Sequence, residues 1–151
     1  MGYNRTSMLF LQSVALLLAL ANPLAFSTIY RGTQSRIEEP REVAIRTADE
    51  WSTLWTAHAP GAPVPIVNFR REMVVGVLLG TRPTGGYSVE IATIEPKGSE
   101  TVVTYRVEEP GRDAMVTQAL TSPVHLVRLS TRKGQVRFER AARLTPVSQP
   151  H

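Results

Sequence analysis

The sequence contains no cysteine among its 151 residues. Disulfide bonds, thiolate metal sites, cysteine nucleophiles and a lipid attached to an N-terminal cysteine are therefore excluded. The fold must be stable through its hydrophobic core alone. A hydrophobic content of 42% in a chain of single-domain length is enough to build such a core.

Lysine is scarce as well. Lys97 and Lys133 are the only lysines, so arginine carries nearly all of the positive charge, and the formal net charge is +4. A solvated surface accounts for this charge, and the alternative is a patch that faces a cell envelope, a nucleic acid or an acidic protein. Among these three possible partners of the patch, we predict that a nucleic acid is not bound. The basic residues of the last third of the chain are Arg128, Arg132, Lys133, Arg137, Arg140 and Arg143.

Residue types that carry catalysis are few. The only aspartates are Asp49 and Asp113. Ser122, His125 and Asp113 are one conceivable hydrolytic triad. His125, however, stands in an alternating apolar run, where a packed or surface histidine is the ordinary explanation. A small hydrolase is therefore the least favoured of the functions considered.

Catalytic and nucleotide-binding motifs are also absent. The sequence has no G-x-S-x-G and no H-E-x-x-H. Gly80 and Gly85 have the spacing of a phosphate loop, but Gly86 and Tyr87 replace the lysine and the hydroxyl residue that such a loop needs. We predict a protein that is not an enzyme and has no cofactor and no metal site.

The N-terminal region has no charge between Arg5 and Arg31, and residues 8–21 form an apolar run that ends in small residues. This pattern is typical of a signal peptide. Small residues precede two possible cleavage points, before Asn22 and before Thr28, and we favour the second, which makes residues 1–27 the leader. We expect a secreted, periplasmic or envelope-associated protein.

An uncleaved membrane anchor is the alternative to a signal peptide. A spanning helix needs about 20 largely apolar residues. The run here is shorter and is interrupted by Gln12 and Ser13. We therefore expect no membrane insertion once the leader is removed.

One helix is predicted, at residues 47–58. Thr47 and Glu50 have the spacing of a capping box. The residues that follow place an apolar stripe on one helix face, with spacings i, i+3, i+4 and i+7: Trp51, Leu54, Trp55 and His58. We predict that both tryptophans attach the helix to a sheet, and that His58 is a cap that complements the helix dipole.

The rest of the chain predicts a mainly β fold of class α+β, namely an antiparallel sandwich or open barrel of six to eight strands with the helix packed on it. Residues 28–140 are expected to form one domain and residues 141–151 a flexible tail. Two hairpins are predicted, 87–95 with 101–108 and 124–129 with 135–139. Further strand segments are expected at 42–46, 66–69 and 73–80, with a short edge strand or arm within 28–42.

The stretch Gly80-Thr-Arg-Pro-Thr-Gly-Gly-Tyr-Ser-Val89 is the best candidate for a functional site. It links a run that is apolar on both faces to an alternating run, so it forms a loop on a rigid sheet, where binding residues are often found. Its proline and paired glycines predict a fixed conformation. The alternative is that these residues only make the turn.

The motifs of this stretch resemble a known family. Four segments are similar to the PrcB C-terminal domain, over residues 65–130 in all. They are residues 80–91, Glu109-Pro-Gly111, Val116-Thr-Gln-Ala-Leu-Thr-Ser-Pro123 and His125-Leu-Val-Arg-Leu129. The resemblance implies an exported bacterial, largely β, non-catalytic domain whose namesake associates with a secreted protease. It further implies that the 81–87 loop lies beside the 121–123 turn. Val124 departs from the aromatic residue that is common at that position.

A weaker resemblance links Pro83-Thr-Gly-Gly-Tyr87 to the loop of chagasin-type cysteine-protease inhibitors, although Arg82 replaces the asparagine of that pattern. The leading hypothesis is an exported binding or assembly module with a protein partner, for which a protease is favoured, and with no assigned oligomeric state. A protease inhibitor that uses the loop is the alternative. The predicted partner-binding residues are Arg82, Thr84, Gly85, Gly86, Tyr87, Ser122 and Pro123.

Overall fold

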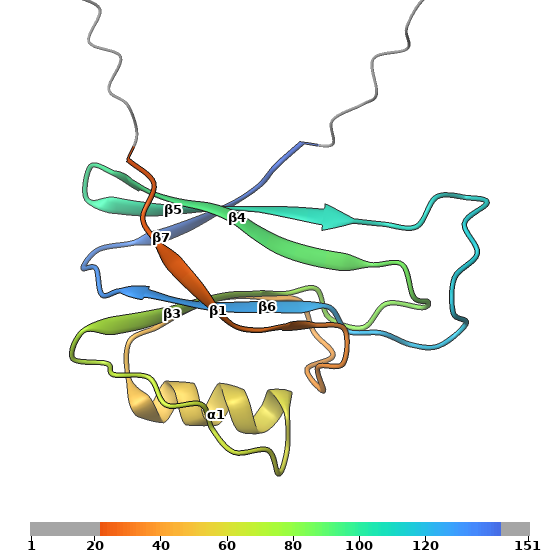
Figure 1. Ribbon diagram of the computed structural model, residues 1–151, viewed down its shortest axis with the longest axis horizontal. Helices are drawn as coiled ribbons and strands as arrows, with labels where there is room; N and C mark the ends of the chain where they lie inside the picture. The colour runs from red at the N-terminus through yellow and green to blue at the C-terminus, as the bar shows by residue number, and fades with distance from the viewer. Residues whose placement is uncertain (1–21, 143–151) are drawn as a thin grey trace, which may run out of the picture.

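The computed structural model describes residues 22–142, so residues 1–21 of the expected leader and 143–151 of the expected tail lie outside the described residues. Two sheets pack face to face, with one helix on the outer face of the larger sheet (Figure 1). The expected sandwich is confirmed. The larger sheet has the order β1 (Phe26–Gly32), β6 (Val124–Ser130), β3 (Glu72–Leu78), β2 (Arg41–Ile45), and the smaller has the order β4 (Ser88–Lys97), β5 (Glu100–Glu108), β7 (Val136–Arg140).

Strand β3 is buried on both faces, as its apolar sequence predicts. Met73, Val75 and Val77 belong to the core between the two sheets. Val74 and Leu78 belong to a second core between the larger sheet and the helix. Because successive side chains point to opposite faces, one strand supplies both cores.

Helix α1 (Ala48–His58) begins where the capping box predicts. The Glu50 N–H donates to Thr47 Oγ1 over 3.3 Å, and the Glu50 carboxylate accepts from the Arg46 N–H over 3.2 Å. The stripe residues Trp51 and Trp55 are buried in the second core. The helix and its role as a packed element are confirmed.

His58 has a different role from the predicted one. It is 1% exposed, and its Nδ1 lies 3.0 Å from Ser35 Oγ. Burial lowers the pKa of His58 below its ordinary value of 6.5. It is therefore a neutral core histidine near neutral pH, and the predicted charged cap is wrong because burial disfavours the imidazolium.

The segment at residues 66–69 is not a strand. Ile66 is 89% exposed, and the Asn68 carbonyl accepts from the N–H groups of Arg71 and Glu72, which makes a turn. Both edges of β3 are already paired, one with β2 and the other with β6. No edge of β3 remains free for a further strand, whatever the β propensity of residues 66–69.

The predicted hairpin of 124–129 with 135–139 is also wrong. Strand β6 lies between β1 and β3, so both of its edges are occupied. Strand β7 crosses to the other sheet and pairs with β5 in parallel, with Thr101 opposite Val136. The hairpin of β4 with β5 is confirmed.

The fold includes residues that the expected leader boundary would remove. The Leu24 N–H donates to the Ile94 carbonyl over 2.7 Å, and Phe26 pairs with Leu129 in β1. Strand β1 is the edge strand expected within the N-terminal arm, but it starts before Thr28. In the part of the chain that the structure describes, no helix is both long and apolar enough to cross a membrane.

Candidate binding surface

The loop of residues 80–87 runs from β3 in one sheet to β4 in the other, at the end of the sandwich on the right in Figure 1. Gly80 and Gly86 have φ values of 72° and 86°, a backbone region that favours glycine. A Cβ on Gly86 would lie 2.9 Å from side-chain atoms of both Pro110 and Val116. Gly86 therefore allows the loop to pack closely on the 109–121 segment.

The two family motifs are adjacent, as the resemblance implies. Arg82 and Thr121 exchange two backbone hydrogen bonds of 2.7 and 3.0 Å. The Gly85 N–H donates to the Thr117 carbonyl over 2.8 Å, and Thr121 Oγ1 donates to the Thr84 carbonyl over 2.7 Å. We call residues 81–87 and 114–121 together the binding end.

Ser122 and Pro123 are buried and position the binding end instead of facing solvent. Ser122 is 6% exposed, and its Oγ donates to the Ile37 carbonyl over 2.8 Å. The Pro123 carbonyl accepts from the Leu79 N–H over 2.9 Å. Their predicted place among partner-contacting residues is corrected, because their side chains are enclosed by the segments they connect.

Arg82 and Tyr87 are both half-buried and contact one another. The guanidinium carbon of Arg82 lies 5.8 Å from the centroid of the Tyr87 ring, within range of a cation–π interaction. Arg82 also borders a hollow of about 200 Å³ between β2 and β5. The contact holds both side chains in place at the surface of the loop.

Two residues that the sequence analysis did not single out are the most exposed apolar side chains here. Met115 is 102% exposed and Leu120 is 71% exposed. Leu120 also borders an open hollow of about 280 Å³ whose other walls include residues 33–36 and Thr81.

The signal for these two residues was present but ambiguous. Residues 114–120 have an apolar spacing that suits a strand or a helical turn, and the structure forms neither. Val116 turns inward against Gly86, while Met115 and Leu120 point away. An irregular segment cannot bury all of its apolar residues on one face, because it has no fixed period.

The grouping of Ser122, His125 and Asp113 is not formed. His125 is 3% exposed, and its Nδ1 accepts from the Ile91 N–H of the other sheet over 2.8 Å. Its Nε2 therefore carries the proton and donates to Thr28 Oγ1 over 2.9 Å. Burial is the main cause that lowers the pKa of His125, and nearby Arg31 lowers it further. This histidine connects the two sheets in its neutral form.

Comparisons with known proteins agree with the resemblance. Residues 73–130 match the family described as PrcB C-terminal. The match runs from the start of β3 to the end of β6, so it contains the loop and all of residues 109–123. No curated protein and no solved structure matches the chain.

Proposed function

We propose that this chain, whose residues 73–130 match the PrcB C-terminal family, is an exported, non-catalytic module that uses its binding end to associate with another protein. The observation that carries the proposal is the exposure of Met115 and Leu120 beside a loop held by hydrogen bonds. A secreted or envelope protease is the favoured partner, which rests on the family resemblance alone.

The composition of the binding end suits a protein interface. Burying a Leu or Met side chain fully contributes about 1.5–3 kcal/mol. The polar residues Thr117 and Gln118 lie between the two apolar residues in sequence and are exposed with them on this segment, and known interfaces combine apolar and polar contacts in this way. Arg82 and Tyr87 are of the types that dominate interface energies.

The backbone of the binding end costs little to order on association. The bonds from Gly85 to Thr117 and between Arg82 and Thr121 already fix the loop in the free protein. A surface that is ordered before binding loses less conformational entropy in the complex. The buried Ser122 stabilises this arrangement, because its Oγ donates to the Ile37 carbonyl.

The test is a pulldown from the native secretome with matched variants. Met115→Asp/Leu120→Asp places charge on the apolar centre and is expected to lose a partner that the wild type retains. Ile66→Asp is the control, because Ile66 is 89% exposed but lies in the connector after α1. Thermal melts verify that each variant is folded. Partner lists that are identical for all three proteins would contradict the proposal.

A further double variant in the loop tests the inhibitor alternative. A chagasin-type mechanism requires residues 83–87 to enter a peptidase cleft, so Arg82→Ala/Tyr87→Ala would relieve inhibition of a papain-type protease. The Gly85 N–H and Thr84 carbonyl are already bonded within the protein. We expect no inhibition by the wild type, and strong inhibition would favour the alternative.

A further inference from the structure

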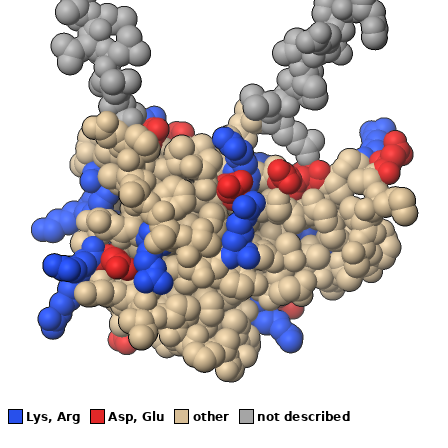
Figure 2. Space-filling model, viewed as in Figure 1, with Lys and Arg blue, Asp and Glu red and all other residues tan. Residues whose placement is uncertain are grey.

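Arginine and lysine side chains gather at the opposite end of the sandwich from the binding end. Figure 2 shows them at the end where β3 begins and β6 ends, on the left in that view. We call this set the basic end: Arg46, Arg70, Arg71, Arg132 and Lys133.

Hydrogen bonds join the three segments of the basic end into one surface. Arg46 donates from Nε to the Arg132 carbonyl over 3.1 Å and from Nη2 to the Gly134 carbonyl over 2.6 Å. The Thr131 N–H donates to the Arg71 carbonyl over 2.8 Å. Segments far apart in sequence thus meet at this end of the sandwich.

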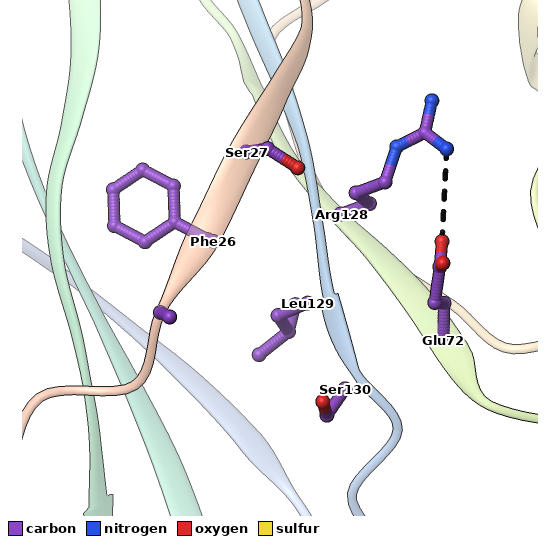
Figure 3. A pocket seen from close by; sticks show the side chains of 7 residues that line it. Phe26, Ser27, Glu72, Arg128, Leu129 and Ser130 are labelled. Carbon is purple, nitrogen blue, oxygen red and sulfur yellow. Dashed lines mark ion pairs between the residues drawn. The ribbon is translucent and has the colours of Figure 1, made fainter.

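The cations of the basic end form no ion pair with a carboxylate among the described residues, unlike several others. Arg128 Nη1 lies 3.7 Å from Glu72 Oε2 at the hollow drawn in Figure 3. Arg137 pairs with Glu100 and Glu139, and Arg140 pairs with Glu109. Within residues 22–142, the five side chains of the basic end form no such ion pair.

Acidic residues at this end are largely engaged by other groups. The Glu50 carboxylate accepts from the Arg46 backbone N–H, Glu72 faces Arg128, and Glu100 faces Arg137.

The basic end also includes a shallow hollow of about 450 Å³. Its walls are Ser99, Thr131, Arg132, Lys133 and Gly134, which combine cations with hydroxyl donors.

We propose that the basic end binds the phosphate-bearing headgroups of an anionic lipid surface. A single small anion is held best by donors that converge on a desolvated point. Here the cations are spread over three turns, and Arg70, Arg71 and Lys133 are exposed. A lipid surface presents many anions at once, so each of these exposed cations can meet its own headgroup. The binding end then faces away from the membrane.

The expected effect follows from the number of charges removed. Each Lys or Arg near an anionic leaflet contributes about 5.5-fold in partition, so removing two lowers binding about thirtyfold. Raising the salt concentration weakens binding as well, because exposed charges are screened.

Sedimentation with phosphatidylglycerol–phosphatidylcholine vesicles tests the proposal on the full chain. Arg71→Ala/Lys133→Ala is expected to lose about thirtyfold in partition. Arg106→Ala/Arg112→Ala removes the same charge from exposed positions elsewhere and is expected to bind like the wild type. Neutral phosphatidylcholine vesicles are the control for membrane binding by the apolar N-terminal run, which all of these proteins share.

Three outcomes would overturn the proposal: equal partition of both double variants, equal binding to neutral and anionic vesicles, or displacement when phosphate replaces chloride at equal ionic strength. The last would assign the site to a free anion. Arg70→Ala/Arg71→Ala provides a second variant on an exposed turn and is expected to show the same loss.

Discussion

Two buried histidines show how single residues connect the parts of this fold. His125 on β6 accepts a hydrogen bond from Ile91 on β4 and donates to Thr28 on β1, so it joins both sheets. His58 packs among aromatic rings, 4.7 Å from that of Tyr30 and 5.0 Å from that of Trp55. Both depend on the neutral imidazole.

The stability of the protein is therefore expected to fall when the pH is lowered from about 7.5 to about 5.5. Burial lowers both histidine pKa values below 6.5 in the folded state. The unfolded state then binds more protons as the pH falls through 6.5, which favours unfolding. Urea unfolding at the two pH values measures the change. His125→Gln should reduce it, and an equal pH dependence in that variant would exclude His125 as a cause.

The two neighbouring glycines of the loop are expected to differ when replaced by alanine. Gly86 has a positive φ, and a Cβ there would lie 2.9 Å from side-chain atoms of Pro110 and Val116. Gly86→Ala should therefore lower the free energy of unfolding by about 1–2 kcal/mol. Gly85→Ala meets its nearest atoms at 3.4 Å and should cost less. Thermal unfolding compares them, with Gly111→Ala as a control in open space. Equal melting temperatures for the two loop variants would contradict this account.

At the scale of elements, helix α1 is fixed to the larger sheet by its two tryptophans. The Trp51 Nε1–H donates to the Pro65 carbonyl over 2.8 Å, so it also holds the connector that follows the helix. Trp55 lies 5.5 Å from Trp51 and 6.2 Å from Tyr30, ring centre to ring centre. Together they link the helix, the connector and β1.

Trp55→Ala is expected to lower the free energy of unfolding by about 3 kcal/mol or more, because a buried indole is replaced by a cavity. Trp55 is 7% exposed. Chemical denaturation measures the loss, with Ser52→Ala on the exposed face of the same helix as the control. If Trp55→Ala left the free energy of unfolding unchanged, the helix would not be part of the core.

Strand β1 depends on residues upstream of Thr28. A chain that begins at Asn22 is expected to be more stable than one that begins at Thr28, because the second loses the bond from Leu24 to Ile94 and the packing of Phe26. The loss should be about 1–3 kcal/mol. Denaturation of the two chains measures it, and equal stability would show that residues 22–27 contribute nothing. N-terminal sequencing of exported protein is accordingly expected to begin at Asn22, contrary to the favoured boundary.

At the scale of the molecule, the binding end and the basic end lie at opposite ends of the same sandwich. The 81–87 loop follows β3, whereas Arg70 and Arg71 precede it. The proposed protein partner and the proposed lipid surface would therefore contact separate regions. The molecule would bridge the two without either site blocking the other.

The two proposed sites are expected to be independent. Met115→Asp/Leu120→Asp should leave vesicle binding unchanged, and Arg71→Ala/Lys133→Ala should leave partner capture unchanged, because distant sites without shared contacts act additively. Assaying each variant in both experiments checks this. Loss of both activities in one folded variant would show that the sites are coupled.

Local sequence determined the elements whose signals lie within a few residues of one another. The capping box and the Trp51 stripe define α1, the turn at Gly98 and Ser99 defines the hairpin of β4 with β5, and the apolar run of β3 predicts burial on both faces. The paired motifs also indicated that the loop lies beside Thr121. Each of these depends on periodicity or on a motif that can be recognised without the partner strand.

Only the tertiary structure decided the pairings and their consequences. Strand β7 could not join β6, because β1 and β3 already occupy both edges of β6, so it crossed to β5. The same competition for edges excluded a strand at residues 66–69. The burial of Ser122, the exposure of Met115 and the gathering of cations at the basic end follow from which segments meet. Such contacts are non-local, and the sequence near each residue does not specify which partner its free edge or side chain will find.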